Sequence, residues 1–326
     1  MAKVLGLGNA LVDIMTKLND DALLDNFSLP KGSMQLVDKK NSNIVLDGTK
    51  ELEKSQSSGG SAANTIHGLA NLGVEAGFIG KVGDDEFGRF FFNDMSQNNI
   101  QPKLLTGKAE TGLAIALVSP DSERTFATYL GAAIELSADD IVPETFKGYD
   151  YFHIEGYLVQ NQKLIEKAVR LAKEQNLKVS LDLASFNVVE DNLDFLKTII
   201  NDYVDIIFAN EEEAHSFTGK EPEDALNEIA KKCEIAIVKI GEKGSLIKKE
   251  NQIHKIGIID ANCVDTTGAG DLYASGFLFG LTKGLSLDKC GEIGAILSGK
   301  VIEVIGSKMD DERWKEIHSL ISKVMS

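Results

Sequence analysis

Cysteine is scarce in this sequence. Its 326 residues include three cysteines, at positions 233, 263 and 290, and no CxxC pair occurs. An odd and dispersed set does not make a disulfide framework, and it does not have the spacing of a zinc site. We therefore expect a protein of a reducing compartment, the cytoplasm.

Long apolar runs and positive charge are lacking as well. No segment approaches the roughly 20 apolar residues of a membrane-spanning helix. The apolar start, residues 4–12, is broken by Asn9 and followed by Asp13, which predicts a first strand and not a signal peptide. Lysine and arginine number 34 against 50 aspartates and glutamates, a net charge of −16. We therefore expect neither nucleic acid nor membrane as a partner, because so acidic a chain repels a phosphate backbone.

Several motifs that mark other enzyme classes do not occur. There is no GxxxxGK[ST], no HExxH and no GxSxG, which argues against P-loop nucleotidases, zinc peptidases of that type and serine hydrolases. The segment Gly6-Leu-Gly-Asn-Ala-Leu11 has the first two glycines of a dinucleotide fingerprint but lacks the third. An NAD-dependent dehydrogenase is therefore disfavoured.

Strand and helix patterns alternate from residue 150 onwards. Apolar strand patterns lie at 151–154, 178–183, 206–208 and 235–240, and helical patterns at 162–175, 193–200, 269–283, 287–302 and 310–324. This alternation is typical of an α/β protein with a parallel sheet covered by helices on both faces. Residues 14–50 and 103–130 contain short strand patterns outside the alternation. We predict a single domain over residues 1–326, in which these two segments combine into a small lid sheet.

The segment Asp265-Thr-Thr-Gly-Ala-Gly-Asp271 carries the strongest chemical signal. Apolar helical periodicity begins directly after it, so Gly268, Ala269 and Gly270 should lie at a helix N-terminus. Free backbone N–H groups and the helix dipole make such an end an anion site. Asp271 then lies in the first turn, where its carboxylate can take a proton from an attacking hydroxyl. The structural alternative is a glycine-started helix with an acidic first turn.

Polar residues after other predicted strands form a second group of candidates. Asn210-Glu-Glu-Glu213 is either an ordinary helix cap with acids in the first turn or part of a Mg²⁺ site. Asn9, Asp13 and Glu155 follow strands at the sheet edge where open α/β sheets bind ligands; as an alternative they are solvated loop groups. Gly59-Gly-Ser-Ala-Ala-Asn64 offers close backbone approach and an amide for hydroxyl-rich ligands, or is a simple loop-to-helix turn.

The segments at 59–64 and 265–271 together resemble the paired motifs of the ribokinase-like (PfkB) family of carbohydrate and nucleoside kinases. They stand in the order and spacing of that family, with the segment 210–213 between them, and the resemblance covers essentially the whole chain. It implies a ribokinase-like αβα sandwich with a mostly parallel central sheet and a small β-sheet lid over the sugar site. It also implies an ATP-dependent transfer of the γ-phosphoryl group to a primary hydroxyl.

The resemblance assigns roles residue by residue. It implies that Asp271 is the general base and that Gly268, Ala269 and Gly270 form the anion hole. Acceptor-binding positions are then Asn9, Asp13, Gly59, Gly60, Ser61, Asn64, Arg124 and Glu155. Nucleotide-binding positions are Asn210, Lys239, Gly241 and Gly244. Asn210 and Glu213 match the motif that organises Mg²⁺ through water, and Asp265 and Thr267 match positions that hold a monovalent cation such as K⁺ in many members.

Different segments of the sequence indicate different acceptors. The segments 8–14 and 210–214, and Glu123-Arg124 ahead of Tyr129, are similar to adenosine kinases of the family. Against this, 265–271 and Glu155 are similar to sugar kinases. The chain thus resembles a bacterial adenosine-kinase-like branch. We rank a nucleoside such as adenosine first and a free sugar such as ribose or a ketose second. A phosphorylated sugar is third, because no basic cluster lies near the acceptor loops.

Two further expectations complete the interpretation. A catalytically silent protein that senses a sugar or nucleoside is the alternative of a different class, disfavoured by the intact Asp271 and Asn210-Glu213. Lid strands would also leave exposed edges that a second copy of the chain can cover, which allows a homodimer through the lid.

Overall fold

The computed structural model describes residues 2–121 and 123–326, which form two sheets of different size. Over these residues the larger sheet has nine strands in the order β14-β13-β12-β11-β10-β9-β1-β5-β6. In chain order they are β1 (Val4–Leu7), β5 (Ala76–Val82), β6 (Ile100–Thr106), β9 (Tyr151–Glu155), β10 (Lys178–Asp182), β11 (Ile206–Asn210), β12 (Ile235–Lys239), β13 (Ser245–Lys249) and β14 (Gln252–Ile256). Neighbours from β6 to β12 are parallel, and β13 and β14 are antiparallel to their neighbours. The predicted mostly parallel central sheet is confirmed.

The strands of this sheet are buried on both faces. Along β12, Ile235 and Ile237 belong to one hydrophobic core, whereas Ala236 and Val238 belong to the other. Side chains of a strand point alternately to opposite faces, so an unbroken apolar run is what a doubly covered strand needs.

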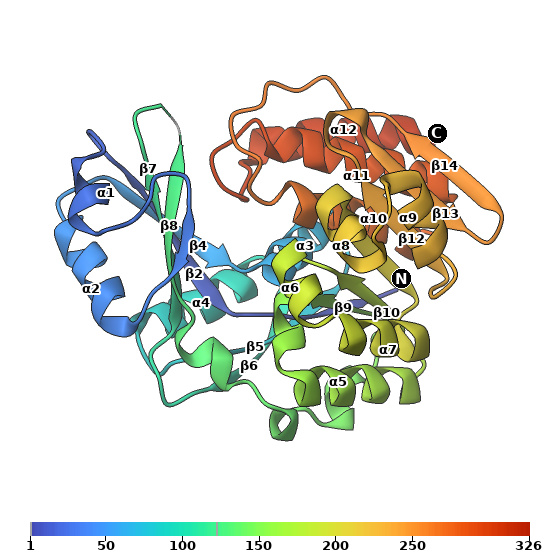
Figure 1. The fold of residues 1–326 in the computed structure, drawn as a ribbon, viewed down its shortest axis with the longest axis horizontal. Coiled ribbons are helices and arrows are strands. Elements are labelled where there is room, and N and C mark those ends of the chain that lie inside the picture. Colours follow the sequence, from blue (N-terminus) through green and yellow to red (C-terminus); the bar gives the residue numbers. More distant parts are fainter. Residues whose placement is uncertain (1, 122) are drawn as a thin grey trace.

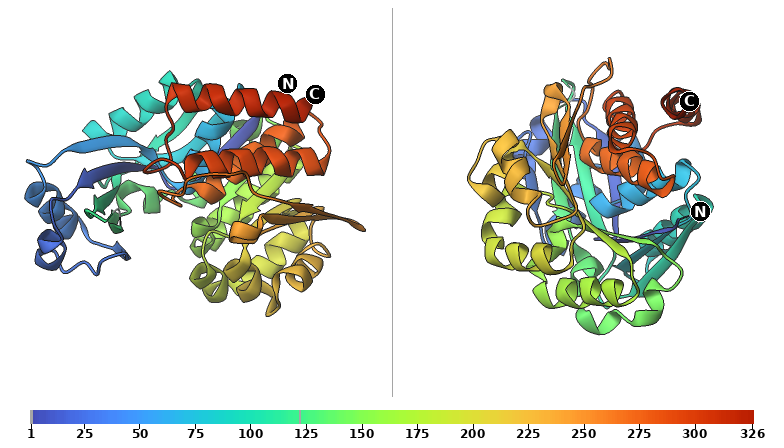
Figure 2. Two further views of the ribbon diagram at one scale, coloured as in Figure 1. Left: turned by 90° about the horizontal axis from the view of Figure 1, so that it is seen from above. Right: turned by 90° about the vertical axis from the view of Figure 1, so that its right-hand side faces the viewer.

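Helices cover the two faces in the way the alternation predicts. One core includes side chains from α3 (Ser61–Asn71), α4 (Glu86–Gln97), α10 (Ala269–Thr282), α11 (Leu287–Val301) and α12 (Asp311–Met325). The other includes side chains from α5 (Gln162–Glu174), α6 (Phe186–Asp191), α7 (Leu193–Tyr203), α8 (Glu211–Thr218) and α9 (Pro222–Ile229). Figure 2 shows the orange and red helices on one side of the sheet and the green and yellow helices on the other. Short 3₁₀ turns are η1 (Gly131–Glu135), η2 (Ala138–Asp140), η3 (Pro143–Phe146), η4 (Gly156–Gln160) and η5 (Gly241–Lys243).

The smaller sheet stands beside this layered part as the lid (Figure 1). Its strands, in the order β3-β8-β7-β2-β4, are β2 (Leu11–Lys17), β3 (Met34–Leu36), β4 (Lys54–Gly59), β7 (Gly112–Val118) and β8 (Arg124–Tyr129). Two helices, α1 (Ala22–Asn26) and α2 (Lys39–Gly48), lie between lid strands in the sequence.

The boundaries of the lid differ from the predicted 14–50 and 103–130. Residues 103–106 belong to β6, which pairs in parallel with β5 in the large sheet. The lid instead gains β4, whose sequence KSQSSG has no apolar alternation and is exposed over its first half. Consecutive residues in its first half are exposed, so neither face is apolar there and the sequence shows no alternation. Among the described residues, no helix is long and apolar enough to span a membrane.

Candidate active site

A cleft of about 1070 Å³ lies between the lid and the carboxyl ends of the parallel strands. Polar residues at or just after five strand ends line it, namely Asn9, Glu155, Asp182, Asn210 and Lys239. Residues from lid strands face them, among them Leu11, Asp13, Met34, Leu36, Ala114, Phe126 and Thr128. This is the edge at which open α/β sheets bind ligands.

Asp271 lies in the first turn of α10, as the sequence predicts. Its Oδ1 accepts a hydrogen bond from the Ser61 hydroxyl at 2.7 Å, and its Oδ2 accepts one from Asn64 Nδ2 at 3.0 Å. Burial raises the pKa of the Asp271 carboxyl to about 6, against the lowering effect of these two hydrogen bonds. A carboxylate whose pKa lies close to the working pH is well suited to general base catalysis.

The turn before Asp271 presents backbone donors to the cleft. Gly268 caps α10 with φ 76°, a left-handed conformation that favours glycine. The Ala269 N–H donates to the Thr266 carbonyl at 3.1 Å and is thus used within the turn. The N–H groups of Gly268 and Gly270 have no acceptor among the described residues, so these two are the donors that remain for an anion.

Glu155 and Asn9 form the floor of the cleft. One carboxylate oxygen of Glu155 accepts from the Asn9 backbone at 2.9 Å and from its side-chain amide at 2.5 Å, and the other accepts from the Ala62 N–H at 3.0 Å. Glu155 is 1% exposed, and burial raises its pKa to about 7. Its oxygens therefore hold the end of β1 against the start of α3. Gly60 completes this junction with φ 99°, where a side chain would overlap the Asn9 carbonyl.

Asp13 brings a lid carboxylate to the same place. It lies on β2 opposite Ser57, and its carboxylate fills the space that a side chain at Gly59 would need. Burial raises the pKa of Asp13 to about 7, and the ammonium group of Lys308 opposes that rise. Lys308 Nζ lies 3.4 Å from Asn64 Oδ1, and the Ser307 hydroxyl donates to the same oxygen at 2.8 Å. Sequence reasoning missed Ser307 and Lys308, which stand in an irregular segment ahead of α12.

A second polar group lies at the ends of β10, β11 and β12. Glu213 accepts hydrogen bonds from the Asn210 backbone at 2.8 Å and from its side chain at 2.7 Å, and the Asn210 side chain in turn accepts from the Glu213 N–H at 2.8 Å. The ordinary helix cap is thus present. Burial, together with the nearby Asp182, raises the pKa of Glu213 to about 7. Lys239 Nζ donates to Asp182 Oδ2 at 3.0 Å, and a Cβ at Gly270 would lie 2.9 Å from the same ammonium group.

Asp182 was missed by sequence reasoning, although it ends β10 just as Asn210 ends β11.

Gly241 and Gly244, predicted beside the nucleotide, form the turn after β12 with φ 54° and 93°. The Ile240 N–H donates to the Gly244 carbonyl at 2.8 Å, which closes that turn. Neither glycine lines the cleft.

The donor set around Glu213 suits a magnesium ion held through water. No cluster of three or more His, Cys, Asp or Glu groups is placed to hold a metal directly within residues 2–121 and 123–326. Both Glu213 oxygens are engaged by Asn210. Mg²⁺ keeps several waters and shares its shell with phosphates, so this carboxylate fits an outer position around the ion.

Asp265 and Thr267, which are predicted to hold a monovalent cation, contact each other, and both also contact Arg124. One Asp265 oxygen accepts from the Thr267 N–H at 2.6 Å, and the other accepts from the Gly306 N–H at 2.6 Å and forms an ion pair with the Arg124 guanidinium. Arg124 also donates to the Thr267 hydroxyl at 3.3 Å. The guanidinium supplies the charge that a cation would bring, so this arrangement does not fit K⁺ on Asp265. Arg124 itself does not line the cleft.

Comparisons with known proteins agree with this fold. Residues 34–313 match the model of the pfkB family of carbohydrate kinases. The chain is similar to an uncharacterized sugar kinase of Archaeoglobus fulgidus (28% identity, covering 74% of this chain and 96% of the relative) and to a 5-dehydro-2-deoxygluconokinase of Clostridium perfringens (28%, 81% and 84%). Among solved structures it resembles a probable sugar kinase from Rhizobium etli (33% identity, covering 99% of each chain, TM-score 0.88). It also resembles the adenosine kinase from Sinorhizobium meliloti (33%, 98% and 99%, TM-score 0.86).

The fold and the family define a phosphotransferase that acts on an alcohol group of a sugar or nucleoside. The chain belongs to the pfkB family of carbohydrate kinases. Kinases of this family use ATP, generally with Mg²⁺.

Proposed function

We propose that this protein transfers the γ-phosphoryl group of ATP to the primary hydroxyl of a nucleoside of the adenosine type. The observation that carries the proposal is Asp271, held by Ser61 and Asn64 in the cleft at the start of α10 with a pKa of about 6. Phosphoryl transfer requires positioning and charge stabilisation more than covalent chemistry. A base at a helix N-terminus positions the acceptor hydroxyl, and the free N–H groups beside it stabilise the charge on the phosphoryl group.

Each group has a distinct task in this proposal. Asp271 takes the proton of the acceptor hydroxyl. The N–H groups of Gly268 and Gly270, with the Lys239 ammonium group beside Gly270, stabilise the negative charge on the transferred phosphoryl. Asn210 and Glu213 hold the water shell of Mg²⁺, which when bound neutralises phosphate charge. Asp13 and Asn64 bind acceptor hydroxyls, and the lid excludes water.

The lid wall supports a nucleoside over a free sugar. Met34 and Leu36 line the cleft but are 53% and 64% exposed, and the ring of Phe126 lies in the same wall. Apolar side chains left open inside a cleft suit a flat, weakly polar group such as a nucleobase, whereas a free sugar would leave them facing water. Glu155, the residue that favours a sugar kinase, is engaged by Asn9 and Ala62 beneath the cleft.

The test is an assay of the purified protein with MgATP and a panel of acceptors. The panel holds adenosine, other nucleosides, ribose, fructose and fructose phosphates. ADP release above the background without acceptor is measured, and the product mass identifies the phosphorylated compound. Turnover with a nucleoside is expected. Turnover with free sugars alone would show that the acceptor is a free sugar and not a nucleoside. Binding of an acceptor in calorimetry without any phosphoryl transfer would favour the catalytically silent sensor.

We also propose a homodimer through the lid. The edge strand β3 is exposed at all three residues, and the outer half of the other edge, β4, is exposed as well. Exposed strand edges invite pairing with another chain. Light scattering of the wild type and of a Leu36→Pro variant tests this. Ser33 and Val37 pair with β8, so the N–H of Leu36 points to the open edge, where proline removes the donor. A dimer that the substitution leaves intact would place the interface elsewhere.

A further inference from the structure

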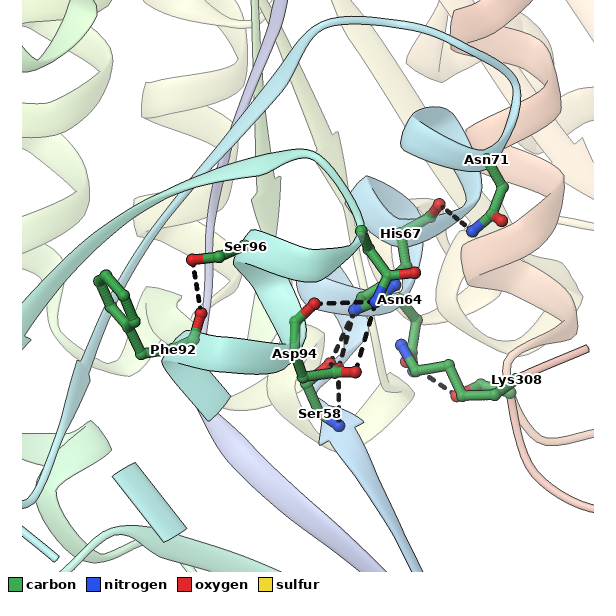
Figure 3. A network of polar contacts seen from close by, with 10 residues as sticks. Ser58, Asn64, His67, Asn71, Phe92, Asp94, Ser96 and Lys308 are labelled. Atoms are coloured by element: carbon green, nitrogen blue, oxygen red, sulfur yellow. Dashed lines mark hydrogen bonds and ion pairs between the residues drawn. The ribbon is translucent and has the colours of Figure 1, made fainter. Parts of the chain in front are cut away.

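Lys308 is a lysine in polar surroundings that the proposed chemistry does not use. It follows Gly306 and Ser307 and precedes α12. Its ammonium group lies 3.4 Å from Asn64 Oδ1, and Figure 3 shows its side chain reaching Asn64 from the segment ahead of that helix.

The contacts with Lys308 and with Asp271 require the same orientation of the Asn64 amide. A side-chain amide has an oxygen that accepts and a nitrogen that donates, and the two ends have nearly the same shape. A serine hydroxyl such as that of Ser307 accepts or donates, so its 2.8 Å contact is compatible with either end. A lysine ammonium group only donates. The end that faces Lys308 must therefore be the oxygen, and Nδ2 is left to face Asp271, 3.0 Å away.

The charge of Lys308 faces a group of carboxylates from three elements. They are Asp13 on β2, Asp94 on α4 and Asp271 on α10. The fourth titratable neighbour, His67 on α3, is neutral near pH 7, because burial lowers its pKa to about 4. Burial likewise lowers the pKa of Lys308 to about 8, but the carboxylates counteract this effect. Lys308 is thus the cation of this group at neutral pH.

The carboxylate of Asp94 is held on the opposite side of the network drawn in Figure 3. The Ser58 hydroxyl donates to Asp94, and His67 Nε2 lies 2.7 Å from that hydroxyl and 3.2 Å from Asp94 Oδ2. These neutral donors fix Asp94 without cancelling its charge. If the charge of Lys308 is lost, the negative charges of the three carboxylates are no longer offset and repel one another.

We propose that Lys308 is a positioning residue, which fixes the Asn64 amide so that Nδ2 faces Asp271 and which offsets the negative charge of Asp13, Asp94 and Asp271. The proposal rests on the proposed function, in which Asp271 is the base. Loss of Lys308 removes one of the two donors on Asn64 Oδ1 and leaves Ser307 alone on that oxygen, so the amide is held less firmly against Asp271. Loss of the charge makes each nearby carboxylate harder to ionise.

The experiment compares the wild type with Lys308→Met, which keeps length and loses both donor and charge. We expect kcat to fall about 10- to 100-fold, the scale of a misplaced catalytic group, with an unchanged KM for ATP. In the profile of kcat/KM against pH, the acid limb is the range in which the rate falls as the pH is lowered. This acid limb should move to higher pH. Lys308→Arg, which has only donors and keeps the charge, should restore the position of that limb. Unchanged kcat and an unmoved limb in Lys308→Met would overturn the proposal.

Two further variants serve as a control and as a substitute in this experiment. Lys300→Met removes another lysine of low exposure, which lies on α11 and pairs with Glu303 and with Glu316 of α12. It should lower the melting temperature without moving the limb. If Lys308→Met does not fold, Lys308→Gln keeps a polar contact with Asn64 but lacks the charge, and it must show the same upward movement of the limb.

A measurement without turnover separates this proposal from the proposed function. Carbon-13 NMR of aspartate-labelled protein follows the ionisation of Asp13 and Asp271 without any substrate. We expect both pKa values to be higher in Lys308→Met than in the wild type. If the wild type phosphorylates no acceptor, the proposed function fails while this titration still decides on Lys308. Identical titrations in the two proteins would refute the role of Lys308 in either case.

Discussion

Arg124 and Asp265 form an ion pair that joins the lid to the layered part of the molecule. Arg124 is the first residue of the lid strand β8, whereas Asp265 lies just ahead of α10 and is 1% exposed. Thr267, which lines the cleft, contacts both residues. The position of the lid is therefore tied to the turn that begins α10.

Removal of this arginine should loosen that connection. In Arg124→Ala the buried Asp265 loses its cation, and breaking a buried pair by removing one partner costs about 3 kcal/mol. We expect a lower unfolding free energy in urea and more ATP hydrolysis without acceptor, because a loosened lid admits water. Arg89→Ala, whose pair with Asp84 is exposed, should cost less than about 1 kcal/mol. Equal losses in the two variants would mean that the Arg124 pair does not hold the lid.

Asp271→Asn should separate catalysis from folding. Asparagine keeps the shape and a contact with Ser61 but takes no proton, so kcat should fall about 10²- to 10⁴-fold with little change in the KM for ATP. The melting temperature at pH 8 should be equal or higher, since a buried charge is removed. The control is Asp288→Asn, an acid in the first turn of α11, which should keep wild-type turnover. Wild-type turnover in Asp271→Asn would disprove its role as base.

The pH dependence of activity follows from the same carboxyl groups. Burial raises the pKa of Asp271 to about 6 and that of Asp13 and Glu155 to about 7. The ionised base is required, so kcat/KM should fall on the acid side with an apparent pKa between about 6 and 7 that belongs to the group as a whole. Rates measured between pH 5 and 9 provide the test. A profile that is flat down to pH 5 would contradict it.

Stability should depend on pH through Glu155. Its folded-state pKa of about 7 lies above its ordinary value of 4.5. Its stabilising contribution is therefore complete below about pH 4.5 and is lost as the pH rises through 7. Relative to Glu155→Gln, the wild type should lose up to about 1.4 kcal/mol per pH unit inside this window, measured by urea unfolding at pH 5, 6.5 and 8. Glu166→Gln, on the exposed side of α5, should run parallel to the wild type, and a parallel course of Glu155→Gln would refute the argument.

Two glycines with the same backbone conformation test the start of α10. Gly268 and Gly284 have φ of 76° and 70°, but a Cβ at Gly268 would lie 2.8 Å from the Ser307 side chain, whereas one at Gly284 meets nothing within 4 Å. Gly284→Ala should cost about 1–2 kcal/mol through backbone strain alone. Gly268→Ala should cost more and also reduce kcat, because Ser307 holds Asn64. Similar kcat values in both variants would mean that this contact does not matter for turnover.

Local sequence patterns were sufficient for the parts of the fold and site that depend on neighbours in the chain. Strands buried on both faces read as apolar runs, and the glycines before Asp271 indicated the start of α10. The rule that ligands bind at strand ends led to Asn9, Glu155 and Asn210, and the same rule applied to β10 would have found Asp182. The structure brings these residues to one cleft; their catalytic roles stay predictions.

Other features depend on contacts that leave no local pattern. The strand β4 is polar and its first half is exposed on both faces, so it lacks the alternation of a strand with one buried face. Lys308 and Ser307 stand in a segment without periodicity. Only tertiary packing, in which α10 contacts α3 and α11 and α11 contacts α12, brings them to Asn64. The pairing of Arg124 with Asp265 depends on where the lid rests, which no spacing in the sequence encodes.

The hydrogen bond from Ser307 to Asn64 joins positions 243 residues apart. A chain emerging from the ribosome, at about 5–20 residues per second, presents the proposed acceptor-binding residues of β2 and α3 well before the proposed base and the segment that contacts Asn64. The proposed site is therefore completed only after α10 and Lys308 have been synthesised.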